Sequence, residues 1–284
     1  MANVRIVTDI TAHLEPELIA QHQITIVPVE IRLGQETFRI GAREQWDRFF
    51  RAIADGPAKL TVATTPASIF QETFGRLSRE TEEILVLLNS GRLSHAYAEA
   101  QAAARAFLGR CRISVVDSMS ASWGLGLLVK VAAEAAVEGR SLDSIVRLVR
   151  GLVPHIYLVF FVDRLDYLER WKRIGPAQAR LGTMLRIKPL LLVEDGDIVP
   201  MEKVRTRTMA IEKLADFVAE FASIQKVVIV KSPLENEIND LVGELRALLS
   251  QALPGEQFPV IEYDPVLGCH LGPEALGVFV FEGL

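Results

Sequence analysis

Residues 112–137 read RISVVDSMSASWGLGLLVKVAAEAAV. They begin with a short β-rich run, Arg112–Val116, and pass through a turn into a long helical run, Ser122–Val137. A buried strand followed by a helix is the repeating unit of α/β proteins. The segment therefore predicts an α/β architecture, and the same order of elements continues on both sides of it.

Short β-rich runs alternate with helical patterns along the rest of the chain, which indicates α/β units with largely parallel strands. The other predicted strands are Val4–Thr8, Ile24–Leu33, Ile84–Leu88, Ile156–Val162, Ile187–Val193, Lys226–Val230, Phe258–Tyr263 and Val278–Phe281. The other predicted helices are Gln45–Ala54, Ala67–Ser78, Ala96–Leu108, Leu142–Leu152, Thr208–Ala222 and Leu234–Leu249.

The predicted strand Ile24–Leu33 differs from the others because apolar and polar residues alternate along it. This is the pattern of a half-exposed strand, and Pro28 places it at a sheet edge, since proline lacks the N–H that a central strand needs. We therefore expect the first sheet to be mixed, although most of its strands are parallel.

The chain has 284 residues, which favours two α/β domains over a single core. Pro154 follows a helical run and precedes a strand, so we predict domains 1–153 and 154–284. The first should hold a mostly parallel sheet flanked by helices. The second should hold a mixed sheet with a hairpin, because Asp195-Gly196 between two β-rich runs is typical of a tight hairpin turn.

Composition points to a cytoplasmic globular protein. The start lacks the apolar core of a signal peptide, and the most apolar helical stretch, residues 121–139, contains Lys130, Glu134 and Glu138. The two cysteines lack metal-ligand spacing. A net charge of −5 argues against nucleic-acid binding, although residues 164–207 hold ten Lys or Arg against six Asp or Glu and could meet an acidic partner or anionic membrane.

The common catalytic and cofactor motifs are missing, so we expect neither an enzyme nor a cofactor. Gly124-Leu125-Gly126 has Val129 where a dinucleotide loop needs a third glycine, and no glycine is followed by lysine as in a P-loop. Ser94 is not in a GxSxG turn, and the five histidines show no HExxH pattern.

A colinear series of strings, however, resembles the DegV family from residue 7 to residue 278. The matching strings are Val7-Thr8-Asp9 with Thr11-Ala12, Ser90-Gly91-Arg92-Leu93-Ser94 with Tyr97, Val116-Asp117-Ser118 with Gly124-Leu125-Gly126, Asp163 to Leu168 with Arg173-Ile174, Ile187-Lys188-Pro189, Gly196 to Arg207, and Pro265 to Val278. Because they cover both predicted domains in order, they make the assignment specific.

The resemblance implies a DegV-like two-domain α/β protein that binds a long-chain fatty acid in an interior tunnel. It also implies that the acid's carboxyl group is presented to a separate fatty acid kinase for acyl phosphate formation. Each buried CH₂ contributes about 0.8 kcal/mol, so an apolar tunnel can hold the chain without a covalent bond. The carboxylate, in contrast, needs hydrogen-bond donors when it leaves water.

The same resemblance names the candidate residues. Ser94 stands at the family's head-group serine, at the start of a predicted helix, and His270 stands at the histidine of the closing string. Thr64 or Thr65 would replace the threonine of a family loop, since Ala63 occupies its strict position. A further set, Arg170, Arg173 and Arg205, would contact the kinase or an anionic membrane surface.

The chain departs from the family pattern at several polar positions: Ile10, Ile40, His95-Ala96, Trp171-Lys172 in place of a glycine pair, and Cys269 and Leu271 in place of the threonines beside His270. Two other functions therefore stay open. One is an acyl-ester hydrolase that uses Ser94 and His270. The other is a lipid-sensing regulatory or interaction protein.

Overall fold

The computed structural model of the chain describes residues 4–41, 43–54, 60–172, 174–234 and 237–283. The chain divides into two compact units. One is formed by Met1–Gln45 with Ala58–Pro154, and the other by Trp46–Pro57 with His155–Leu284. Each unit is described by itself below.

The first unit holds β1 (Arg5–Asp9), α1 (Pro16–Gln21), β2 (Thr25–Val27), β3 (Val29–Leu33), β4 (Glu36–Ile40), β5 (Leu60–Thr64), α3 (Ala67–Leu77), β6 (Glu83–Leu88), α4 (Ala96–Ala104), η1 (Arg105–Phe107), β7 (Arg112–Asp117), α5 (Ser122–Val137) and α6 (Leu142–Leu152). The second holds β8 (Ile156–Val162), α7 (Asp166–Arg170), α8 (Pro176–Met184), β9 (Lys188–Glu194), β10 (Asp197–Val204), α9 (Arg207–Ala219), β11 (Ile224–Lys231), α10 (Glu237–Ala252), β12 (Val260–Glu262), α11 (Pro265–Leu271) and β13 (Ala275–Glu282). The helix α2 (Arg43–Ala54) and the short turn η2 (Val153–His155) lie where the chain passes between units.

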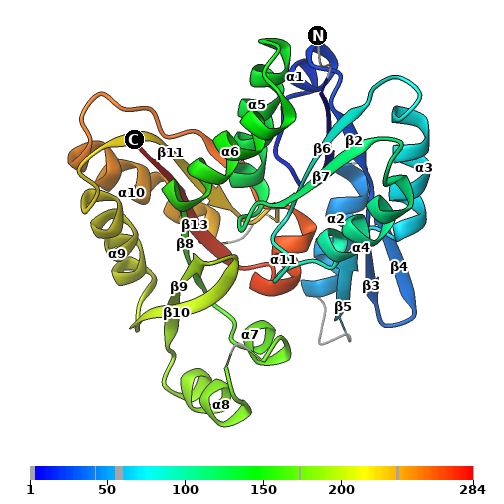
Figure 1. The fold of residues 1–284 in the computed structure, drawn as a ribbon. Coiled ribbons are helices and arrows are strands. Elements are labelled where there is room, and N and C mark those ends of the chain that lie inside the picture. Colours follow the sequence, from blue (N-terminus) through cyan, green and yellow to red (C-terminus); the bar gives the residue numbers. More distant parts are fainter. Residues whose placement is uncertain (1–3, 42, 55–59, 173, 235–236, 284) are drawn as a thin grey trace. The chain divides into compact units, whose positions relative to one another are not determined.

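The first unit is built on a parallel four-stranded sheet in the order β2-β1-β6-β7. Along β6, Val86 and Leu88 pack with α3 and α4, while the alternate residues Leu85 and Leu87 point to the opposite face and are also buried. The helices α5 and α6 contact this sheet as well (Figure 1). Burial on both faces explains why the strands read as continuous apolar runs.

The predicted mixed first sheet with one edge strand at Ile24–Leu33 is wrong. The chain breaks at Pro28 into β2, which is the parallel edge of the main sheet, and β3, which is the centre of a separate antiparallel sheet in the order β4-β3-β5. Proline is therefore found between two strands and not inside one. The outer strands β4 and β5 of this small sheet were not predicted from the sequence.

The second unit holds a mixed six-stranded sheet in the order β10-β9-β8-β13-β11-β12. As predicted, β9 and β10 form a hairpin, in which both Asp195 (φ 48°) and Gly196 (φ 77°) have the positive φ that a type I′ turn requires. The helices α9 and α10 cover one face of this sheet around a core that includes Phe161, Leu214 and Val278 (Figure 1). The predicted α/β class is confirmed, with a parallel main sheet in the first unit and a mixed sheet containing a hairpin in the second.

The predicted helix at Gln45–Ala54 forms as α2, and its residues from Trp46 onward belong to the second unit. Phe49, Phe50 and Ile53 are buried, and the Tyr167 hydroxyl donates a hydrogen bond to the Ile53 carbonyl oxygen (2.6 Å). A division of the chain at a single point would place this helix in the first unit.

A buried carboxylate ties β1 to its neighbour β6 in the first unit. Asp9 Oδ1 accepts hydrogen bonds from the N–H (2.9 Å) and the hydroxyl of Thr11, and Oδ2 accepts one from the N–H of Asn89 (3.4 Å). The Asn89 side-chain amide donates to the Thr11 hydroxyl oxygen (3.0 Å). Burial raises the pKa of Asp9 above its ordinary value of 3.8, although these hydrogen bonds act in the opposite direction.

In the first unit, Gly126 of the string Gly124-Leu125-Gly126 lies where two backbone segments come close together. A Cβ built on Gly126 in α5 would lie 2.4 Å from the carbonyl oxygen of His13. His13 also donates its N–H to the carbonyl oxygen of Ser122 (3.3 Å), so the loop after β1 runs directly against the first turns of α5. Gly126 allows this close approach of two backbone segments.

We expect Gly126→Ala to destabilise the protein by about 1–3 kcal/mol, because the added methyl group meets backbone atoms that cannot move alone. The matched control is Gly151→Ala in α6, where a Cβ would meet nothing within 4 Å. That change should stabilise the helix by up to about 1 kcal/mol. Denaturant unfolding of both variants checks this, and an equal effect of the two changes would contradict the close approach.

The raised pKa of Asp9 predicts a pH dependence of stability. The folded state binds the Asp9 proton more tightly than the unfolded state, so this group stabilises the fold at low pH and the benefit is lost as the pH rises through the folded pKa. We expect the stability of wild type relative to Asp9→Asn to fall over the pH range that runs from 3.8, the ordinary pKa of this group, up through its folded pKa. Urea unfolding across this range measures it.

The control is Asp117→Asn, which removes a half-buried carboxylate that also accepts two backbone N–H bonds, from Gly91 (3.1 Å) and Met119 (2.8 Å). If wild type instead gains stability relative to Asp9→Asn as the pH rises, the hydrogen bonds lower the pKa of Asp9 more than burial raises it.

Candidate functional site

Buried polar side chains gather where the parallel strands β1, β6 and β7 end. They are Asp9, Thr11, Asn89, Ser90, Ser94, Ser118 and Ser120, each less than 5% exposed. The carboxyl ends of parallel strands meet at one edge of a sheet, and in open α/β sheets this edge is the usual place for a ligand. We call this set the polar edge of the first unit.

Hydrogen bonds fix the turn after β6 within the polar edge. The Ser90 N–H lies 2.9 Å from the Ser120 carbonyl oxygen and 3.0 Å from Asn89 Oδ1. The Ser90 carbonyl oxygen accepts from the N–H groups of Leu93 and Ser94, both at 2.9 Å. Asn89 therefore connects the Asp9 carboxylate to the turn that carries Ser94.

Ser94 lies two residues before α4 and is 2% exposed. Its hydroxyl oxygen accepts a hydrogen bond from the N–H of Ala96 (3.2 Å), which satisfies one of the N–H groups at the start of the helix. The side chain thus lies beside the N-terminal end of α4, where the helix dipole favours negative charge. This end faces the same edge of the sheet as Asp9, because α4 follows β6.

The two candidate threonines lie at the turn between β5 and α3, also in the first unit. The Thr65 hydroxyl is buried and donates to the Pro28 carbonyl oxygen (2.7 Å). The Thr64 hydroxyl is buried and has no hydrogen-bond partner among the described residues, as is also true of the Thr8 hydroxyl on β1. Thr64 is therefore better placed than Thr65 to donate to a ligand, since a buried hydroxyl without a partner destabilises the fold.

His270 lies in the second unit on α11, whose seven residues are all buried. Asp264 caps this helix by accepting hydrogen bonds from the N–H groups of Val266 (2.8 Å) and Leu267 (3.1 Å). The His270 side chain is 1% exposed. No helix was predicted over Pro265–Leu271, because Gly268 interrupts the helical pattern.

Two glycines let aromatic rings pack directly on α11. A Cβ at Gly268 would lie 2.5 Å from the Phe50 ring, and a Cβ at Gly272 would lie 2.5 Å from the Tyr167 ring. Gly272 also has a φ of +78°, which strains any other residue. The backbone two residues after His270 thus has a conformation that favours glycine.

Trp171 covers His270 from the residue after α7. The two ring centroids are 4.4 Å apart with planes inclined at 39°, and the indole N–H donates to the Cys269 carbonyl oxygen (2.8 Å). No sequence pattern indicated this contact, because 98 positions separate Trp171 from Cys269.

The arginines predicted to contact a partner lie in different surroundings. Arg170 forms an ion pair with Asp166 (3.6 Å) and lies over the Tyr167 ring (4.9 Å to the centroid), so it is held within the second unit. Arg205 is exposed just after β10. Arg173 lies outside the described residues.

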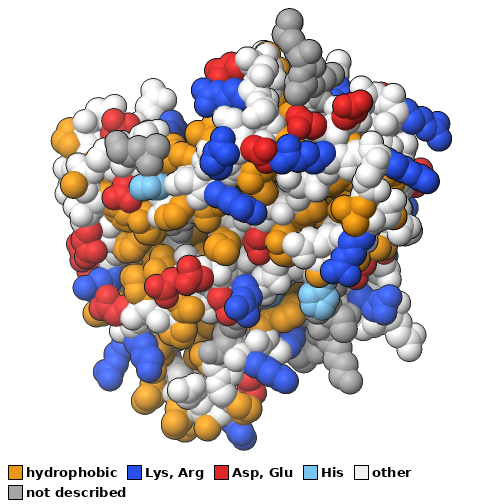
Figure 2. Space-filling model, viewed as in Figure 1, with side chains coloured by type: hydrophobic (Ala, Val, Ile, Leu, Met, Phe, Trp, Pro, Cys, Tyr) orange, Lys and Arg blue, Asp and Glu red, His pale blue; other side chains and the backbone are white. Residues whose placement is uncertain are grey.

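The helix α8 exposes three apolar side chains on adjacent turns. Leu181 is 58% exposed, Met184 79% and Leu185, at the helix end, 56%. The spacing of three and four residues puts them on one face, and the exposed Arg180 and Arg186 lie next to them in sequence. Figure 2 shows apolar side chains with Lys or Arg beside them over the part of the molecule where Figure 1 places α8.

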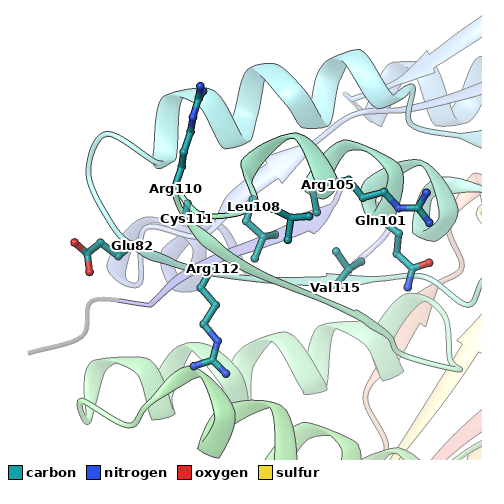
Figure 3. Close-up of a pocket in the computed structure, with 11 residues that line it drawn as sticks. Glu82, Gln101, Arg105, Leu108, Arg110, Cys111, Arg112 and Val115 are labelled. Carbon is teal, nitrogen blue, oxygen red and sulfur yellow. The ribbon is translucent and has the colours of Figure 1, made fainter.

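A hollow of about 800 Å³ lies at the other end of α4 in the first unit, between the helix end and β7 (Figure 3). Arg105, Leu108 and Arg110 line it, and Arg110 and Arg112 point in opposite directions. Arg112 forms an ion pair with Asp143. Because Arg112 starts β7, the hollow lies at the amino end of the parallel strands and not at the edge that holds Ser94.

The described residues contain neither a metal-binding cluster nor a membrane-spanning helix. No group of three or more His, Cys, Asp or Glu residues in that part of the chain is arranged to hold a metal ion. None of its helices combines the length and the apolar character needed to cross a bilayer.

Comparison with known sequences gives the family. The family model described as an uncharacterised protein of the DegV family matches residues 3–283. A DegV domain-containing protein of Streptomyces coelicolor is 35% identical over 280 residues, covering 98% of this chain and 98% of the relative. The protein DegV of Bacillus subtilis is 28% identical, covering 97% of this chain and 98% of its own length.

Solved structures agree with this. A Thermus thermophilus DegV family protein, described by its fatty acid binding, has a TM-score of 0.82 at 29% identity, covering 99% of this chain and 100% of that one. Bacillus subtilis DegV, described as a fatty acid binding protein, has a TM-score of 0.81 at 26% identity, with coverage of 99% and 100%. The resemblance inferred from the sequence strings is confirmed, and the chain belongs to the DegV family.

Proposed function

We propose that this chain binds a long-chain fatty acid in an interior tunnel and, in the cytoplasm, presents the carboxylate to a partner kinase. The observation that carries the proposal is the polar edge of the first unit, where buried hydroxyls and the start of α4 converge on Ser94. The relatives from Thermus thermophilus and Bacillus subtilis, both above 25% identity, support a fatty acid as the ligand.

The acyl chain and the head group need different surroundings. Transfer of a 16-carbon chain from water stabilises the complex by roughly 0.8 kcal/mol per CH₂, so the apolar part supplies most of the affinity. The carboxylate has to exchange water for fixed donors. We assign this role in the first unit to Ser94 and Thr64, with Thr65 as a supporting residue held by Pro28.

His270 is proposed as a further carboxylate donor from the second unit. An imidazole N–H can donate to a carboxylate, and a buried histidine gives a stronger bond than an exposed one because water does not compete. Its contribution is tested separately from that of Ser94, by His270→Ala.

The partner is proposed to be a kinase because a bound carboxylate oxygen is a nucleophile for the terminal phosphoryl group of ATP, with ADP leaving and an acyl phosphate as product. The exposed Arg205 is a candidate contact for this partner. Arg170 and Arg173 keep the same proposed role, with Arg170 already paired to Asp166 in the absence of a partner.

We also propose transient contact with an anionic membrane, where a fatty acid would be taken up or released. The exposed apolar face of α8, formed by Leu181, Met184 and Leu185, supports this contact together with the arginines at positions 180 and 186. Apolar side chains beside basic ones are typical of helices that bind the surface of a bilayer.

Ser94→Ala should weaken fatty acid binding by about 10- to 100-fold, since a hydrogen bond to a charged group contributes about 1.5–3 kcal/mol. Mass spectrometry of the denatured wild-type protein should first identify a co-purifying acid, and calorimetry with that acid measures both affinities. The control is Ser141→Ala, which also removes a hydroxyl that accepts a backbone N–H, that of Ser144 (3.4 Å), at the start of α6.

If Ser94→Ala and Ser141→Ala bind the fatty acid equally well, Ser94 is not part of the binding site. If the wild-type protein neither carries nor binds a fatty acid, the proposed function is wrong. Acyl-ester hydrolysis is measured on the same proteins. Turnover that disappears in Ser94→Ala would favour the hydrolase over the carrier.

Replacement of Leu181, Met184 and Leu185 by glutamine should reduce binding to vesicles that contain an anionic lipid by about tenfold or more, because three apolar side chains no longer enter the bilayer. Vesicle co-sedimentation measures it, with purely zwitterionic vesicles for comparison. The control replaces Leu108 and Val137, which are 80% and 71% exposed on the first unit, in the same way. An equal loss in the control would show that exposed apolar residues act without regard to position.

A further inference from the structure

Trp171 occupies a position where the resemblance to the DegV family leads us to expect one of two glycines after Arg170. The largest side chain thus stands in place of the smallest. The change is not isolated, because the residues on both sides of His270, Cys269 and Leu271, stand in place of threonines. The surroundings of His270 in this chain have therefore lost two hydroxyls and gained an indole.

The indole makes two contacts that act on the same short segment. Its ring lies 4.4 Å from the His270 imidazole, centroid to centroid, and its N–H is 2.8 Å from the carbonyl oxygen of the preceding residue, Cys269. The first contact limits rotation of the imidazole, and the second fixes the indole relative to the backbone that carries it. Together they hold one orientation of the imidazole ring.

Other groups hold the backbone of α11, whereas Trp171 contacts the imidazole itself. The Asp264 carboxylate fixes the start of the helix, and Gly268 and Gly272 receive the rings of Phe50 and Tyr167. Gly272 also accepts a hydrogen bond at its carbonyl oxygen from the Tyr263 hydroxyl (2.8 Å). These contacts position the backbone, and the indole is the ring that lies against the His270 side chain itself.

We propose that Trp171 is a positioning residue for His270: it holds the imidazole in the orientation that donates to the ligand carboxylate and so contributes to fatty acid affinity. The inference rests on the proposed function for its effect on binding. Its structural part, the fixed imidazole, can be measured without any ligand.

The structural part is tested by NMR of protein labelled at histidine. The chain has only five histidines, and His270→Ala assigns the signal of His270. A stacked indole shifts the imidazole protons upfield, so Trp171→Gly should move the His270 signal downfield, whereas Trp171→Phe, which keeps a ring, should retain most of the shift. A His270 signal that is the same in wild type and Trp171→Gly would overturn the inference.

The binding part is tested by calorimetry with the co-purifying fatty acid. Trp171→Phe loses the N–H bond and should bind about three- to tenfold more weakly, and Trp171→Gly, which also loses the stack, about tenfold or more. The control is Tyr157→Phe in the same unit, which likewise removes one aromatic donor, here to Glu282 (3.1 Å). It should bind as wild type does.

A double-mutant cycle separates positioning from general damage to the fold. If Trp171 acts through His270, Trp171→Gly should have little effect on affinity in a His270→Ala background. The same loss in both backgrounds would overturn the inference while leaving the proposed function intact. A wild-type protein that binds no fatty acid would instead overturn the proposed function, and with it the binding role of Trp171.

Discussion

The buried carboxylate of Asp9 is the constraint on which the first unit depends. A carboxylate without water must accept hydrogen bonds, and here the donors come from the loop after its own strand and from the end of β6. Through Asn89 the same set of bonds reaches the turn that leads to Ser94. The Asp9 carboxylate is therefore hydrogen-bonded, directly or through Asn89, to the segments that follow β1 and β6.

The second unit fixes its short helix α11 by different means. Here aromatic rings fill the space next to glycines, so that Phe50 and Tyr167 lie against backbone that any larger residue would displace. Close packing of this kind is rigid because every substitution is felt by several neighbours. The polar edge of the first unit is held by hydrogen bonds, whereas α11 is held mainly by shape.

This division suits a protein that holds an amphiphile. In the proposed complex, the buried hydroxyls and the start of α4 at the polar edge hold the charged head group. Three of the departures from the family pattern, Cys269, Leu271 and Trp171, lie next to His270, and Trp171 supplies a ring contact that a glycine cannot make.

Sequence alone was sufficient for the α/β class, for most long strands and helices, for the Asp195-Gly196 hairpin and for the family, because periodicity, turn chemistry and colinear strings are local properties. It could not place β4 and β5, the break at Pro28 or the assignment of α2 to the second unit, since these depend on which surface each segment packs against. It named Ser94 and His270 but neither the Asp9–Asn89 bonds nor the Trp171 stack. Those contacts join residues about 80 to 100 positions apart, and only the tertiary structure brings them together.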